Sequence, residues 1–126
     1  MTLVLDAGAL IALERDDRDM WVRLNAARAS GTAPVTHGGV IARVWRGGTG
    51  RQAMLARALK GVQVVALDDE LGRRAGLLLS RADTKDVVGA AVVALVRDGD
   101  IVVTSDPDDI AALAAVHAAP VRILPV

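Results

Sequence analysis

Short apolar runs alternate with helix-forming segments along this chain of 126 residues, and this alternation constrains the fold more than any other feature. The runs are rich in Val, Leu and Ile and show no regular alternation with polar residues. Strands of that composition are buried on both faces, as in a parallel sheet covered by helices on each side. The predicted strands are 2–5, 33–36, 62–66, 101–104 and 121–124.

Segments of helical length stand between these strands and supply the crossovers that a parallel sheet needs. The predicted helices are 9–15, 20–29, 40–45, 51–59, 69–81, 86–97 and 108–117. Hydrophobic residues make up 52% of the sequence, which is enough to build a core without disulfide bridges. No internal repeat or linker divides the chain. We therefore expect a single α/β domain over residues 1–126.

The sequence contains no cysteine, so disulfide bridges and cysteine-ligated zinc are excluded. His37 and His117 lack the spacing of a zinc-binding pair, and we expect them to be structural or surface residues. The first residues lack the basic start of a secretory signal, and no run approaches the roughly 18 apolar residues of a membrane span. These features predict a cytoplasmic protein that does not enter the membrane.

Acidic residues stand at the ends of predicted strands and at the starts of predicted helices. Asp6 ends the first strand, Asp86 opens a helix, and Asp106 and Asp109 follow the strand 101–104. Open α/β folds bind their ligands at the carboxyl edge of the sheet, and Mg²⁺ and Mn²⁺ prefer oxygen ligands. We therefore expect these carboxylates to share a divalent cation.

Helix capping is the alternative explanation for two of these acids. Asp86 stands where an N-cap or first-turn acid belongs. Ser105-Asp106-Pro107 is typical of a cap followed by proline at the first helical position. Asp6 has no comparable capping signal, so its position favours a role in the site.

Lysine plus arginine and aspartate plus glutamate both number 15, so the net charge does not indicate a polyanionic partner. Five basic residues nevertheless fall in one segment that contains no acid: Arg43, Arg46, Arg51, Arg57 and Lys60. An ordinary solvated helix face would explain them. A rim that contacts RNA phosphates beside an acidic pocket would also explain them, with Arg43, Arg46 and Arg51 as the candidate contacts.

Three motifs in this order resemble the PIN domain of VapC-type toxins over essentially the whole chain: residues 3–13 with Leu3-Val4-Leu5-Asp6-Ala7 at their start, Asp86-Val87-Val88-Gly89-Ala90-Ala91, and Val103-Thr104-Ser105-Asp106-Pro107-Asp108-Asp109. The resemblance implies a three-layer α/β/α sandwich around a central parallel sheet, usually in a homodimer. It also implies an endoribonuclease that binds Mg²⁺ or Mn²⁺ through clustered acids. A VapB-like antitoxin would inhibit it by occupying its groove, which we expect near residues 9–13 and 40–45.

On this resemblance the family's first, third and fourth acids correspond to Asp6, Asp86 and Asp106, with Asp109 as an accessory. The second acid is usually a Glu on the third helix, and Arg43 stands in its place. That charge reversal would remove a ligand and repel a cation. Gly89 stands where similar toxins carry another acid one helical turn after Asp86, although it is also compatible with close packing of a helix on the sheet. Both departures predict weak metal binding.

Three functions remain open. The first is a metal-dependent endoribonuclease toxin of a type II toxin–antitoxin system, weakened by Arg43 and Gly89. The second is a catalytically silent PIN-like module that binds an antitoxin or RNA. The third is a phosphoacceptor receiver domain, which needs paired acids after its first strand, whereas Asp6 is followed only by Ala7 and Gly8. Because unrelated functions share α/β folds, the site must decide between them.

Overall fold

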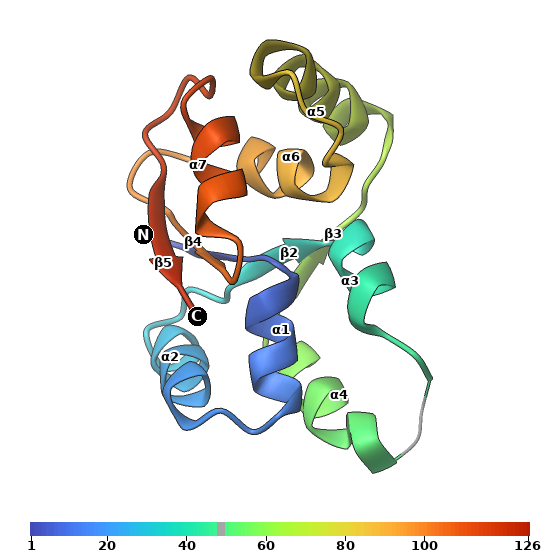
Figure 1. Cartoon of the computed structure of the whole chain (residues 1–126). Helices are drawn as coiled ribbons and strands as arrows, with labels where there is room; N and C mark the ends of the chain where they lie inside the picture. Colours follow the sequence, from blue (N-terminus) through green and yellow to red (C-terminus); the bar gives the residue numbers. More distant parts are fainter. Residues whose placement is uncertain (48–49) are drawn as a thin grey trace.

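A five-stranded sheet in the order β3-β2-β1-β4-β5 forms the centre of the computed structural model, which describes residues 1–47 and 50–126 (Figure 1). All neighbouring strands pair in parallel. The strands are β1 (Leu3–Leu5), β2 (Val35–His37), β3 (Gln63–Val65), β4 (Ile101–Thr104) and β5 (Arg122–Pro125). Each of the five predicted strands is therefore present, with only slightly shifted bounds.

Strands β1 and β4 lie side by side in the middle of the sheet, with Leu5 opposite Val103. All three residues of β1 are buried, as their uninterrupted apolar sequence predicts. Since the two strands run in the same direction, their carboxyl ends meet at one edge of the sheet. Asp6 and Asp106, which follow these strands, are brought to that edge by the pairing.

Helices cover both faces of the sheet, which gives the predicted three-layer α/β/α sandwich. Figure 1 shows α1, α2 and α4 below the sheet and α5, α6 and α7 above it. The helices are α1 (Ala7–Glu14), α2 (Arg18–Ala29), α3 (Gly38–Val44), α4 (Ala53–Leu59), α5 (Asp69–Ala82), α6 (Val87–Ala94) and α7 (Pro107–Ala114), with a 3₁₀ turn η1 (Gly50–Gln52) before α4. Among the described residues, no helix has both the length and the apolar composition that crossing a membrane requires.

Helices α6 and α7 end earlier than the sequence predicts, because their last turns tighten. The N–H groups of Leu95 and Val96 donate to carbonyl oxygens three residues earlier instead of four. Val116 and His117 repeat this pattern after α7. Such 3₁₀ turns are common where an α-helix ends, and apolar periodicity continues through them, so the sequence pattern overshoots the helix.

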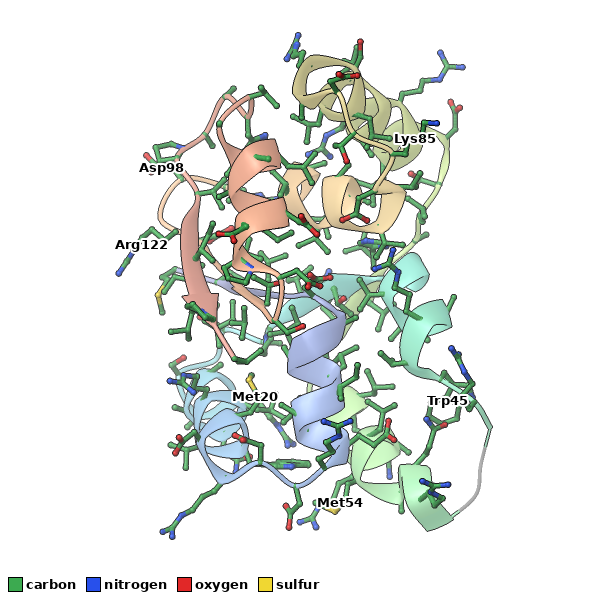
Figure 2. All side chains as sticks on the ribbon, viewed as in Figure 1. Met20, Trp45, Met54, Lys85, Asp98 and Arg122 are labelled. Atoms are coloured by element: carbon green, nitrogen blue, oxygen red, sulfur yellow. The ribbon has the colours of Figure 1, made fainter. Side chains whose placement is uncertain are left out.

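The core fills the space on both sides of the sheet. Helix α6 packs against α5 and α7 and is buried from Gly89 to Ala94, which explains why it is apolar around its whole circumference. On the other face, Leu10 and Leu13 of α1 are fully buried. Met20 of α2 is buried as well and lies between α2 and α1 in Figure 2.

Gly8 allows α1 to approach the segment that follows β4. A Cβ atom at Gly8 would lie 2.6 Å from Cβ of Ser105 and 2.8 Å from its backbone nitrogen. A backbone atom cannot swing aside as the end of a flexible side chain can. Glycine at this position therefore sets the distance between α1 and the turn that carries Asp106.

Gly8→Ala is expected to destabilise the protein by about 1–3 kcal/mol, because the added methyl group must displace the backbone at Ser105. Gly72→Ala and Gly76→Ala, in exposed positions of α5 with open space around them, are the matched controls. These two changes should stabilise the protein by about 0.5–1 kcal/mol. Urea denaturation of the three variants gives the comparison. Equal effects at Gly8 and Gly72 would contradict the close approach.

Candidate functional site

Asp6 stands directly after β1 and is almost completely buried, with 5% of its surface exposed. Its Oδ1 accepts a hydrogen bond from the backbone N–H of Ala7 at 2.8 Å, and it is the N-cap of α1. The expectation that Asp6 has no capping role is therefore wrong. The cap was missed because the helix was predicted to begin at residue 9, whereas α1 begins at Ala7, directly after Asp6.

Thr104 connects Asp6 to the end of β4. Its buried hydroxyl donates to Oδ2 of Asp6 at 2.7 Å and accepts from the backbone N–H of Asp106 at 3.0 Å. One side chain thus holds both acidic segments at the carboxyl edge. Sequence reasoning assigned no role to Thr104; the available signal was a hydroxyl at the end of an otherwise apolar strand.

Asp106 is the N-cap residue of α7 but makes no capping hydrogen bond with its side chain. The prediction of proline at the first helical position is confirmed by Pro107, whereas the predicted side-chain cap is wrong. The side chains of Asp106 and Asp109 are both exposed. The carboxylate of Asp106 is therefore accessible to a ligand, next to the segment that Thr104 fixes.

Asp86 opens α6, and its Oδ1 accepts from the backbone N–H of Gly89 at 2.9 Å. The predicted N-cap is confirmed. Nη2 of Arg43 lies 3.4 Å from the same oxygen, and the exposed fractions of the two side chains are 51% and 28%. Ion pairs this exposed contribute at most about 1 kcal/mol. The arginine that stands where an acid was expected thus places its positive charge on the candidate site.

Gly89 provides the space in which the Asp86 carboxylate lies. A Cβ at Gly89 would lie 2.9 Å from Cγ of Asp86 and would also overlap its Oδ2. The three atoms nearest to that position all belong to the Asp86 carboxyl group, so this group is the first neighbour that a larger residue at Gly89 would meet. An aspartate at this position would push Asp86 into another rotamer.

His37 is fully buried at the end of β2 and joins α3 to α6. Its Nδ1 accepts from the N–H of Gly39 at 3.0 Å, so Nε2 carries the proton and donates to the carbonyl oxygen of Val88 at 3.0 Å. Burial lowers the pKa of the imidazole below 6.5, against the raising effects of the Val88 carbonyl and the charge of Asp6, while the charge of Arg43 lowers it further. The predicted structural role of this histidine is confirmed, but the influence of the Asp6 and Arg43 charges on its pKa was not predicted.

The three arginines predicted to contact RNA, Arg43, Arg46 and Arg51, differ in their contacts within the protein. Arg46 folds back on the end of α3, where its guanidinium donates to the carbonyl oxygens of Ala42, Arg43 and Trp45 at 2.8–2.9 Å. Figure 2 shows Trp45 just beyond this helix end. Arg43 pairs with Asp86, and Arg51 is exposed in η1. Arg43 and Arg51 are therefore better candidates than Arg46 to contact an RNA phosphate.

The donor chemistry of the site suits a hard cation, since carboxylate oxygens are the ligands that Mg²⁺ and Mn²⁺ prefer. Oδ2 of Asp6 accepts one hydrogen bond and keeps a second lone pair, and the Asp106 carboxylate is exposed. Across residues 1–47 and 50–126, however, no three acidic or histidine side chains are spaced to hold an ion together. The residues therefore fit an ion held by one or two carboxylates and water, and the shared site of Asp6, Asp86 and Asp106 stays a prediction.

A hollow of about 390 Å³ lies beside the acids, between α1 and the turn after β4. Its lining residues are Gly8, Ile11, Ala12, Arg15, Asp17, Ser105 and Val126. Two further hollows, of about 310 and 430 Å³, lie near the starts of β1 and β4, away from the acids. The lining of the first hollow includes Ile11 and Ala12 of the groove expected near residues 9–13 and 40–45, and it contains no residue of 40–45, so the hollow matches only the first part of that expectation.

Comparison with known proteins identifies a solved structure with a similar fold. The sequence matches no family model and no curated protein. The structure is similar to a chain in the crystal structure of VapBC2 from Rickettsia felis bound to a DNA fragment from their promoter, with a TM-score of 0.71 and 12% sequence identity. The alignment covers 98% of this chain and 99% of the other. At this identity the likeness establishes the fold, and it confirms the predicted PIN-like α/β architecture.

Acidification below pH 6.5 is expected to destabilise the protein through His37. Because the pKa of His37 is lowered on folding, the unfolded chain binds this proton more readily, so stability is present above 6.5 and is lost as the pH falls through the folded pKa. His37→Asn should retain the acceptor for Gly39 N–H and lose the bond to Val88, at a cost of about 1 kcal/mol at neutral pH. Urea denaturation over a pH series should show a flatter decline for this variant. Identical slopes for both proteins would contradict the buried neutral imidazole.

Proposed function

We propose that this chain is a metal-dependent endoribonuclease toxin of a type II toxin–antitoxin system, weakened by Arg43 and Gly89. The observation that carries the proposal is the hydrogen-bonded arrangement of Asp6, Thr104 and Asp106 at the carboxyl ends of β1 and β4. Asp6 is buried at this ligand-binding edge, and its Oδ2 keeps a lone pair beyond the hydrogen bond from Thr104. The PIN-like fold supports the same assignment by analogy.

Asp6, Asp86 and Asp106 would hold Mg²⁺ or Mn²⁺, with Asp109 as an accessory. A bound divalent ion would lower the pKa of a coordinated water and neutralise charge that develops on the phosphoryl oxygens. The hydroxyl of Thr104 fixes the Asp6 carboxylate through Oδ2, so this acid needs no reorganisation to serve as a ligand.

Basic side chains near the acids would attract and position the RNA backbone. Arg43 and Arg51 are exposed and would pair with phosphates, which adds a binding term that salt should weaken. Arg46 would act indirectly, because its bonds to three carbonyl oxygens hold the end of α3 and so place Arg43. The Arg43 guanidinium also competes with a metal ion for Asp86, which explains the expected weakness of the site.

A catalytically silent module that binds RNA or an antitoxin is the second candidate. The ion pair between Arg43 and Asp86 favours it, because an internal cation already compensates one of the acids. The lack of a three-acid metal group among the described residues favours it too. Binding of RNA without Mg²⁺-dependent cleavage, in the natural chain and in variants with a strengthened site, would distinguish this function.

Replacing Arg43 is expected to increase Mg²⁺-dependent RNA cleavage in two steps. Arg43→Ala frees Asp86 from its ion pair, which should raise the rate by up to about fivefold at subsaturating Mg²⁺, since exposed pairs are worth up to about 1 kcal/mol. Arg43→Glu also adds an acid and should raise the rate further. Initial cleavage rates on structured RNA, with EDTA controls, give the measurement.

Two controls belong to that experiment. Arg73→Glu on α5 makes the same change in net charge outside the site and should leave the rate unchanged. Asp6→Asn, which keeps an oxygen to accept from Ala7 N–H, should abolish the gain in the Arg43→Glu background. If the natural chain already cleaves as fast as Arg43→Glu, Arg43 does not limit the metal site.

The natural partner is proposed to be a VapB-like antitoxin that docks over the hollow beside α1. Ile11 lines this hollow and is 37% exposed, and the structurally similar protein belongs to a VapBC2 complex. An antitoxin arginine could bind the exposed carboxylate of Asp106.

Co-expression with the product of the adjacent gene should give a complex that copurifies with this chain. Ile11→Glu is expected to abolish copurification, because it places a charge on the apolar wall of the hollow. Val22→Glu, at a more exposed valine on α2, is the matched control and should have no effect. Copurification that survives Ile11→Glu would place the partner on another surface.

A further inference from the structure

A hollow of about 310 Å³ lies at the amino-terminal side of the sheet, between the strands and helix α2. Three apolar side chains from neighbouring strands line it: Leu3 of β1, Ile101 of β4 and Leu124 of β5. The register places Leu3 opposite Ile101 and Val103 opposite Leu124, so the three side chains project from one face of the sheet. Three strands thus supply an apolar floor to this hollow.

Helix α2 leaves the floor open because the side chains that it presents there are small. Ala26, Ala27 and Ser30 line the hollow from the helix. Farther along the same face of the sheet, α1 packs against β1 and β4, and Leu5 and Val103 are fully buried. Side chains normally fill the space between a helix and a sheet to crystal-like density. The hollow is therefore a gap in this layer that a ligand can fill.

Arg23 places a positive charge on the hollow. It stands three, four and seven positions before the small residues, which puts it on the same face of α2. Among the described residues that line the hollow, it carries the one charged side chain. Within residues 1–47 and 50–126, no carboxylate forms an ion pair with its guanidinium. Its N–H groups can therefore donate to an anion in the hollow.

The volume of the hollow limits its ligand to a small molecule. Water-sized groups occupy about 30 Å³ each, so the space corresponds to roughly ten non-hydrogen atoms. Small-molecule sites begin at about 300 Å³ and combine a mainly apolar lining with a few polar groups that orient the ligand. A short apolar chain with one anionic end matches the floor, the size and the charge together.

We propose that this hollow binds a medium-chain carboxylic acid, whose apolar chain lies on the floor and whose carboxylate pairs with Arg23. Covering the floor contributes hydrophobic stabilisation, and arginine can bind a carboxylate through two parallel hydrogen bonds. The hollow lies near the starts of β1 and β4, whereas the acidic site lies at their carboxyl ends. Binding here does not require metal or RNA, so its failure would leave the proposed function untouched.

Titration of the full chain with octanoate, followed through the backbone amide shifts in NMR spectra, tests the site. Octanoate has the chain length that the volume allows. Saturable shifts are expected at Leu3, Ile101 and Leu124, with a dissociation constant of about 1 mM or below. Shifts that do not saturate, or that centre on another part of the chain, would overturn the proposal.

Octanol, an uncharged probe of the same chain length, tests the role of the carboxylate. Arg23→Gln should weaken octanoate binding by about three- to fivefold, as expected for a partly exposed ion pair, and leave octanol binding unchanged. Arg28→Gln, on the same helix but lining a different hollow, is the matched control and should change neither affinity. Equal losses for both probes would overturn the proposed ion pair, because they would show that the apolar stem of Arg23 acts by packing.

Filling the hollow tests the position of the apolar chain. Ala26→Leu places a larger side chain in the space and should weaken the binding of both probes by about tenfold or more. Ala29→Leu, at an exposed position of α2 outside the lining, is the matched control and should bind both probes normally. Circular dichroism should show that all four variants are folded. Octanoate binding that withstands either Arg23→Gln or Ala26→Leu would contradict the site.

Discussion

The parallel pairing of β1 with β4 is the interaction on which the rest of the structure depends. Leu5 and Val103 lie opposite each other in these buried strands. Because the strands run in the same direction, every carboxyl end in this region opens onto one edge, and the helices that follow begin there. Asp6 and Asp106 are neighbours for this reason, although a hundred residues of chain separate them.

Polar groups at this edge serve the fold and the site at once. Asp6 caps α1 and accepts from Thr104, Asp86 caps α6, and His37 joins α3 to α6. Among the described residues, no buried side-chain nitrogen or oxygen lacks a hydrogen-bond partner. Capping and ligand binding are therefore not exclusive explanations of an acid, because a carboxylate oxygen that accepts one N–H keeps a further lone pair.

The electrostatics of Asp86 predict that the proposed metal site binds its ion weakly. The N-terminus of α6 and the guanidinium of Arg43 both place positive charge beside this carboxylate. The same positive charge repels a divalent cation at close range. Because Gly89 has no Cβ, the Asp86 side chain has room to lie in its capping position. Arg43 and Gly89 thus act on a single carboxylate from two sides.

The sequence by itself determined the layers of the fold and the residues at the carboxyl edge. Apolar runs without alternation specify buried parallel strands, and an acid after such a run lies at the edge wherever its neighbours are placed. The cap at Asp86 and the proline at the first position of α7 are equally local signals. These features depend on residues within a few positions of one another, so a pattern can reveal them.

Only the tertiary structure decided which side chains contact one another at the carboxyl edge of the sheet. The Thr104 hydroxyl reaches Asp6 across 98 positions of sequence, and the Arg43 guanidinium reaches Asp86 across 43. Burial of His37 and the use of Arg46 to close α3 also depend on what the fold places around them. No local pattern encodes such contacts, because each partner is chosen by the packing of strands and helices that are distant in the chain.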